Sequence, residues 1–132
     1  YYTTPIGEAR VVREGTKASI ITYGACVHWA LNYVEEENLD VEIIDLRTLM
    51  PLDKESIINS VKKTSRALIL TEDTLFGSIV NDISAILTEE ALEFLKIERV
   101  DLIVMDINME IMDGISCTKE ILRLYPDQKV LA

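Results

Sequence analysis

The chain has 132 residues, of which 48% are hydrophobic and 27% are charged, a composition typical of a globular protein with one domain or slightly more. Its 13 lysine and arginine residues stand against 23 aspartate and glutamate residues, which gives a formal net charge of −10. This acidic balance argues against binding to nucleic acid or to anionic lipid, since both require basic surfaces. No apolar run approaches the roughly 18 residues that a membrane span needs.

The two cysteines and the single histidine offer little material for catalysis or metal binding. Cys26 and Cys117 lie far apart and form no CxxC motif, so a reduced, cytoplasmic setting is expected. Cys26 and His28 are close in sequence, but helical residues two positions apart point to different faces. We therefore interpret them as a core cysteine and a histidine at the start of a helix. The N-terminus has no signal-peptide character and no initiator Met, and the chain is expected to be a piece of something larger.

Strand and helix patterns then alternate in chain order. Short apolar or β-branched runs predict strands at 10–13, 18–22, 41–46, 67–71, 100–106 and 129–131. Amphipathic segments predict one helix at about 25–37, a second that begins after Asp53, which is a suitable N-cap, a third from Gly77 to about Leu95, and a fourth at 115–124. Strands that alternate with helices of this length indicate βαβ units, a mostly parallel sheet and helices on both of its faces.

Apolar spacing also predicts which side of a helix is buried. In the first helix the predicted inner face carries Val27, Ala30, Leu31 and Val34. In the last helix the residues that share one face are Ile115, Thr118, Ile121, Leu122 and Tyr125.

Four motifs in the first part of the chain resemble a known family in their order and spacing. They read PIGEA at 5–9, ITYGACVH at 21–28, IDLRTL with PLD between 44 and 53, and LTEDT at 70–74. Residues 1–99 resemble the C-terminal domain of transketolase-like thiamine-diphosphate enzymes, in particular the beta subunit of branched-chain 2-oxoacid dehydrogenase. The stretch YGACVHWAL favours the 2-oxoisovalerate type over the pyruvate type.

This resemblance implies a domain that does not hold thiamine diphosphate, because in that family the cofactor binds between two other domains. It implies a role at a subunit interface and in docking the acyltransferase core, and no decarboxylase activity for the isolated chain. It also implies that strand 9–13 is an antiparallel edge strand. The expected architecture is therefore a three-layer α/β/α fold with a mostly parallel sheet of five to six strands.

A different family is suggested by the last part of the chain. VDLIVMDINM at 100–109, MDGI at 112–115 and TKEI with YPD between 118 and 127 resemble a response-regulator receiver domain. The resemblance implies that Asp106 matches the phosphoacceptor aspartate and that Asn108 gives a backbone carbonyl to Mg²⁺.

Because neither family is complete, we expect one hybrid domain over 1–132, built from segments 1–99 and 100–132. Our first interpretation is an engineered chimera with no catalytic activity of its own. The alternative is a subunit-interface or docking module of a 2-oxoacid dehydrogenase. A residual Mg²⁺-dependent phosphoacceptor at Asp106 is a third.

The expected topology also brings acidic residues together at the carboxyl edge of the sheet. Strand 67–71 is expected beside strand 101–106, so Glu72 and Asp73 would lie near Asp106. Such a cluster is most simply a solvated rim, and no resident cofactor is expected. The alternative is a weak Mg²⁺ site, because this ion prefers oxygen ligands; its members would be Glu72, Asp73, Asp106 and Asn108.

Two surfaces are candidates for self-association. The last strand, near 129–131, is expected to leave an open edge that could pair with a second chain. The second candidate is the former subunit interface of the dehydrogenase family.

Overall fold

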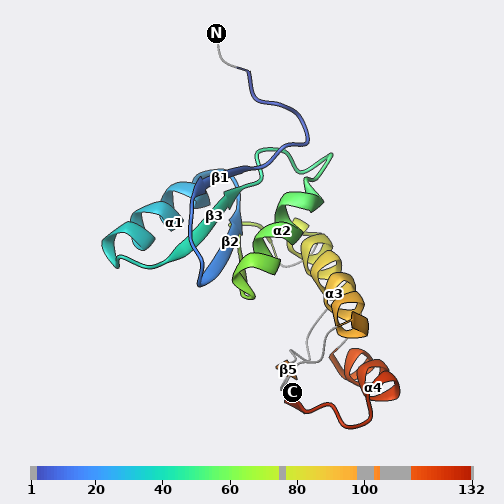
Figure 1. The fold of residues 1–132 in the computed structure, drawn as a ribbon. Helices are drawn as coiled ribbons and strands as arrows, with labels where there is room; N and C mark the ends of the chain where they lie inside the picture. Colours follow the sequence, from blue (N-terminus) through green and yellow to red (C-terminus); the bar gives the residue numbers. More distant parts are fainter. Residues whose placement is uncertain (1–2, 75–76, 98–102, 105–113, 132) are drawn as a thin grey trace. The chain divides into compact units, whose positions relative to one another are not determined.

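The computed structural model describes residues 3–74, 77–97, 103–104 and 114–131 (Figure 1). The chain divides into two compact units, Tyr1–Phe76 and Gly77–Ala132. The first unit contains β1 (Arg10–Arg13), β2 (Ala18–Thr22), α1 (Ala25–Glu36), β3 (Val41–Asp45), α2 (Lys54–Thr64) and β4 (Ala67–Leu70). The second contains α3 (Ile79–Ile97), β5 (Ile103–Val104), α4 (Gly114–Leu124) and β6 (Val130–Leu131).

The first unit is built on a four-stranded mixed sheet with the order β1-β3-β2-β4. β2 pairs in parallel with both β3 and β4, so it lies in the middle of the sheet. β1 pairs with β3 in the antiparallel sense, with Arg10 opposite Asp45. The predictions of an α/β fold and of an antiparallel edge strand at 10–13 are both confirmed.

Helices α1 and α2 cover opposite faces of this sheet. Ile20 of β2 and Ile43 of β3 are partners in the register, and they form one core cluster with Ala30 and Val34 of α1. The neighbouring residue in β2, Ser19, points the other way and bonds to hydroxyls of α2. Right-handed crossovers explain this arrangement, since the chain moves to one side of β2 through α1 and back to the other side through α2. The first unit therefore has three layers.

Gly15 allows the turn after β1 to lie against β3. It is buried, and a Cβ atom at this position would lie 2.2 Å from the carbonyl carbon of Val41. No side chain fits at such a distance from backbone atoms, so the close approach requires glycine.

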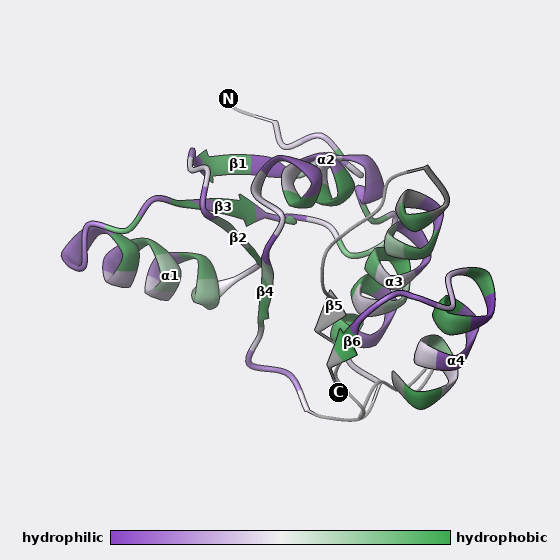
Figure 2. Cartoon of the chain, turned by 60° about the horizontal axis from the view of Figure 1, so that its bottom comes forward, coloured by the Kyte–Doolittle hydropathy of each residue, from purple (hydrophilic) through white to green (hydrophobic). Residues whose placement is uncertain are grey.

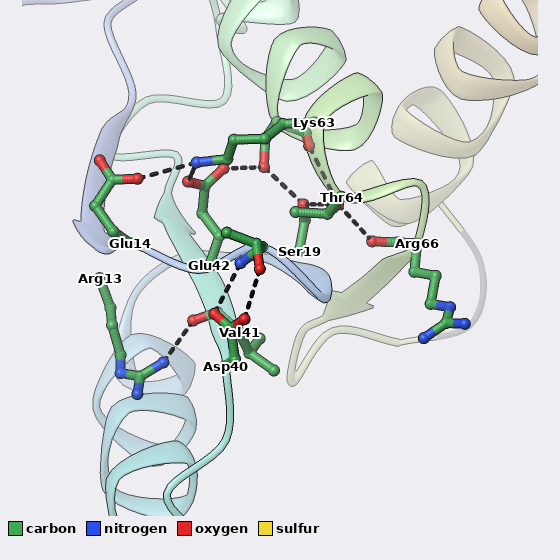
Figure 3. A network of polar contacts seen from close by, with 11 residues as sticks. Arg13, Glu14, Ser19, Asp40, Val41, Glu42, Lys63, Thr64 and Arg66 are labelled. Atoms are coloured by element: carbon green, nitrogen blue, oxygen red, sulfur yellow. Dashed lines mark hydrogen bonds and ion pairs between the residues drawn. The ribbon is translucent and has the colours of Figure 1, made fainter.

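A buried polar network fixes the C-terminal end of α2 on the sheet (Figure 3). Glu42 of β3 is 2% exposed, and its carboxylate accepts hydrogen bonds from the Ser60 hydroxyl and the Lys63 ammonium group. Ser60 and Thr64 in turn share hydrogen bonds of 2.7 and 2.6 Å with the hydroxyl of Ser19. Hydrogen bonding to Glu42 raises the pKa of Lys63. The buried carboxylate is thus paired with a partly exposed ammonium group and accepts a hydroxyl hydrogen bond from Ser60, which satisfies its charge.

The second unit has its own small core. Leu95 of α3 packs with Cys117 and Ile121 of α4, and the partly buried residues around them are Leu92, Tyr125 and Val130. β5 and β6 form a separate parallel pair, with Ile103 opposite Val130. No helix in the described part of the chain is both long and apolar enough to cross a bilayer.

The predicted inner face of α4 is partly wrong. Ile115 and Leu122 are 53% and 38% exposed, whereas Cys117 is buried. The buried row runs through positions 117, 121 and 125, which are four residues apart and pack with the leucines of α3. Ile115 and Leu122 belong to a different row of the same helix.

The single sheet of five to six strands is not what the described residues form. They form one sheet of four strands and one of two, and β4 pairs with no described strand other than β2. The described parts of β5 and β6 are two residues long and pair with each other. Apolar runs identify strands, but the choice of neighbour depends on contacts far apart in sequence. The expected pairing of strand 67–71 with strand 101–106 falls largely outside the described residues.

Candidate functional site

The connections of the first unit create a topological switch point between β2 and β3. These strands are parallel neighbours, but the loop after β2 leads to α1 and the loop after β3 leads to α2, on opposite faces. In open α/β sheets ligands bind at the carboxyl ends of strands where this divergence occurs. The carboxyl edge of the sheet is therefore the candidate functional site.

The loop after β3 is held by local hydrogen bonds. Leu46 donates its backbone N–H to the carbonyl of Thr22, at 2.9 Å, and so continues the pairing of β3 with β2. Arg47 has a left-handed backbone with φ of 58°. Its N–H lies 3.1 Å from Asp45 Oδ1, and its guanidinium Nε lies 3.7 Å from Asp45 Oδ2. The one cation of this loop is thus already paired with the carboxylate of the last residue of β3.

The N-terminal segment is tied to the same loop. The N–H of Gly7 donates to the Thr48 hydroxyl at 2.9 Å, and the N–H of Ala9 donates to Asp53 Oδ2 at 2.8 Å. Asp53 also accepts the N–H of Ser56 at 3.0 Å, so the predicted N-cap is confirmed. Burial opposes its ionisation, but these hydrogen bonds outweigh burial and lower the pKa of Asp53. One carboxylate therefore anchors both a helix start and the segment before β1.

A second bridge crosses from β2 to the loop after β4. Tyr23, directly after β2, donates its phenolic hydrogen to the carboxylate of Asp73. The Thr22 hydroxyl donates to the carbonyl of Leu70 at 2.7 Å beside it. The hydrogen bond to Asp73, together with burial and the negative charges of Asp73 and Glu72, raises the pKa of Tyr23 to about 12. Tyr23 is consequently a neutral donor at every physiological pH.

The structure brings together only part of the predicted acidic cluster. Glu72 and Asp73 lie at the carboxyl edge, where they were expected, and Asp73 is bonded to Tyr23. Asp106 and Asn108 lie outside the described residues, so the weak Mg²⁺ site and the phosphoacceptor role stay predictions. Within the described ranges, no group of three or more His, Cys, Asp or Glu side chains is placed to hold a metal ion. Tyr23 was not predicted as a site residue, although its position at the end of a buried strand is a usable signal.

The cysteines and the histidine agree with the interpretation from spacing. Cys26 is 1% exposed and His28 is exposed, and both cysteines are free thiols. Burial raises the pKa of the Cys117 thiol, which makes it a poor nucleophile.

The polar groups named at the carboxyl edge bond mainly to one another. Arg47 pairs with Asp45, Tyr23 with Asp73, and Thr48 with Gly7 and the carbonyl of Pro51. Chemically, this pattern holds three loops in fixed positions on a rigid sheet. Such an edge is suited to presenting a surface.

Comparison with known proteins shows the family. Residues 7–118 match the family model of the transketolase C-terminal domain. The chain belongs to this family. It is 47% identical over 94 residues to the 2-oxoisovalerate dehydrogenase subunit beta of Bacillus subtilis, a match that covers 69% of the chain and 29% of that protein. It is 43% identical over 94 residues to the pyruvate dehydrogenase E1 component subunit beta of Rickettsia conorii, with the same shares of each chain.

A solved structure supports the same family assignment. The chain superposes on a split gene transketolase, described as an inactive beta4 tetramer, with a TM-score of 0.58 and 25% identity. That match covers 64% of the chain and 29% of the other protein. The chain thus spans about three tenths of the length of the relatives named here.

These matches confirm the first resemblance and leave the second without support. The family match continues to residue 118 and so passes the junction that was expected near residue 99. An engineered hybrid of two families is not supported by these findings. The alternative interpretation, a 2-oxoacid dehydrogenase interface module, agrees with them better.

Proposed function

We propose that the chain acts as the C-terminal interface domain of a 2-oxoacid dehydrogenase beta subunit, of the 2-oxoisovalerate type. The observation that carries this proposal is the 47% identity to the Bacillus subtilis 2-oxoisovalerate dehydrogenase subunit beta. The pyruvate-type subunit of Rickettsia conorii is less similar, at 43% over the same number of residues. The stretch YGACVHWAL, which runs from β2 into α1, favours the same choice.

The proposed domain contributes contacts to a larger assembly and no thiamine chemistry of its own. The braced carboxyl edge supports this, since Arg47, Tyr23 and Asp53 each hold a loop or a helix start. The family resemblance supports it as well, since thiamine diphosphate is there expected between other domains. We accordingly expect neither decarboxylation nor cofactor binding by the isolated chain.

An exchange of segments tests the proposal. The 94-residue stretch of the Bacillus subtilis subunit that aligns with this chain is replaced by the stretch from this chain. Because the two segments would make equivalent contacts, the exchanged subunit should still assemble and support 2-oxoisovalerate dehydrogenase turnover. Assembly is measured by co-purification of the exchanged subunit with its partner subunits and by the size of the complex. Turnover is measured by the amount of reduced product that forms.

A matched variant separates failed folding from failed assembly. The same exchange carrying Ile44→Lys places a charge at a fully buried position of β3 and should lose both folding and assembly. An unmodified exchange that is folded, as judged by circular dichroism, but does not assemble would refute the proposed function.

A further inference from the structure

Helix α1 exposes two aromatic side chains on the side that does not face the sheet. Its inner side is formed by Cys26, Val27, Ala30 and Val34, all buried. Trp29 and Tyr33 are 55% and 60% exposed, and because they are four residues apart they lie on one stripe of the helix. Exposed Trp and Tyr side chains with neighbouring charges are characteristic of binding surfaces.

Carboxylates continue this stripe at the end of the helix. Glu36 follows Tyr33 by three residues and Glu37 by four, and both are exposed. We call Trp29, Tyr33, Glu36 and Glu37 the aromatic–acidic stripe. In Figure 2 the turn of α1 that leads toward β3 is strongly hydrophilic. The stripe thus joins an apolar surface to a negatively charged one.

Folding does not account for these carboxylates. The C-terminal end of a helix carries partial negative charge, so glutamates there are unfavourable and cations are favourable. Here Glu35, Glu36 and Glu37 stand in a row at that end, and the last turn contains no basic residue. From Tyr23 to Asp40 the sequence has no Lys or Arg. No ion pair joins these three glutamates to another residue in the described parts of the chain.

We propose that the aromatic–acidic stripe docks a basic amphipathic segment of another protein. Lysine or arginine side chains of that segment would lie over the rings of Trp29 and Tyr33 and pair with Glu36 and Glu37. Its apolar residues would cover the aromatic surface. A cation at the end of α1 would also complement the helix dipole, which the chain itself leaves uncompensated. The inference goes beyond the proposed function, because it depends on α1 alone and not on membership of a dehydrogenase assembly.

The fluorescence of Trp29 provides a direct assay, since it is the only tryptophan of the chain. The intact protein is titrated with a synthetic helical peptide of lysine and leucine, and with a matched peptide of glutamate and leucine. The basic peptide should shift and strengthen the Trp29 emission in a saturable manner, and the effect should weaken with added salt. The acidic peptide should leave the emission unchanged.

Variants with matched changes of charge test whether the basic peptide binds at the aromatic–acidic stripe. Glu36→Lys should weaken binding of the basic peptide about fivefold, and Tyr33→Ala should weaken it similarly while keeping the fluorescent reporter. Glu55→Lys makes the same change of charge on α2, on the opposite face of the sheet, and should have less than about a twofold effect. Equal weakening by Glu36→Lys and Glu55→Lys would overturn the proposal, because binding would then reflect the overall charge of −10.

Quenching by acrylamide tests whether the stripe is free in the protein alone. We expect Trp29 to be readily quenched at all protein concentrations. Shielding at every concentration would mean that the chain covers its own stripe, and shielding that grows with concentration would mean that a second copy does. Either outcome would overturn the proposal, as would an unchanged emission with the basic peptide.

Discussion

Tyr23 and Asp73 are single residues that join two loops of the candidate site. The end of β2 places Tyr23 at the carboxyl edge, and the loop after β4 brings Asp73 to its hydroxyl. Because β2 and β4 are parallel neighbours, their carboxyl ends must meet at one edge. The position of Asp73 could therefore be predicted from the sequence. Its partner could not, since the pairing of residues 50 positions apart depends on the strand register.

The raised pKa of Tyr23, about 12 against an ordinary 10.0, makes this hydrogen bond sensitive to alkaline pH. The neutral phenol is the donor, so its contribution to stability is complete below pH 10 and is lost as the pH rises through 12. Asp73→Asn should return the pKa of Tyr23 toward its ordinary value, because the acceptor charge is removed.

The measurement is a titration of phenolate absorbance, with Tyr23→Phe subtracted to isolate this residue from the other four tyrosines. A Tyr23 midpoint that is the same in Asp73→Asn and in the unmodified protein would contradict the pairing.

At the scale of elements, the contacts that attach α2 to the sheet differ in how well they can be predicted from the sequence. Its N-cap, Asp53, follows from a local rule, since aspartate before an amphipathic run commonly starts a helix. The buried Glu42 does not follow from any local pattern. Its partners Ser60 and Lys63 are 18 and 21 residues away and reach it only once α2 is packed on the sheet. The order of strands in the first unit is likewise a result of long-range packing.

The Glu42 network predicts that substitutions of Glu42 and of Lys63 destabilise the protein by different amounts. Lys63→Met leaves a carboxylate that is 2% exposed without its cation and should lower the free energy of unfolding at pH 7 more than Glu42→Gln does. Glu42→Gln removes the charge, keeps a polar group for Ser60 and should cost less, about 1–2 kcal/mol.

Urea denaturation measures both variants, with Lys54→Met at the exposed start of α2 as the control. A Lys63→Met protein that is no less stable than Lys54→Met would contradict the stabilising role of this network.

For the whole molecule, the family could be predicted from the sequence, but the full arrangement of the strands could not. Four motifs, at 5–9, 21–28, 44–53 and 70–74, lie in the first unit and identified the family that the comparison then confirmed. They lie at strand ends and loops, where the physical demands on each residue are specific. The expected receiver segment rested on a short stretch, most of which lies outside the described residues. The four-stranded mixed sheet of the first unit agrees with the expected α/β fold, whereas the expected pairing of strand 67–71 with strand 101–106 lies largely outside the described residues.

The central claim, an interface domain, predicts that the isolated chain associates. Leu68 of β4 is a large apolar side chain that is 54% exposed, so it is available for contact with another chain. Leu68→Lys should weaken association, because a charge replaces the apolar side chain at that contact. Val11→Lys, on β1 at the other edge of the same sheet, is the control.

Sedimentation velocity of the intact chain over a wide range of concentrations is the most direct measurement. We predict an average mass that rises above 14.9 kDa with concentration and a weaker rise in Leu68→Lys than in Val11→Lys. A mass of 14.9 kDa at every concentration would contradict the claim that this chain is an interface domain.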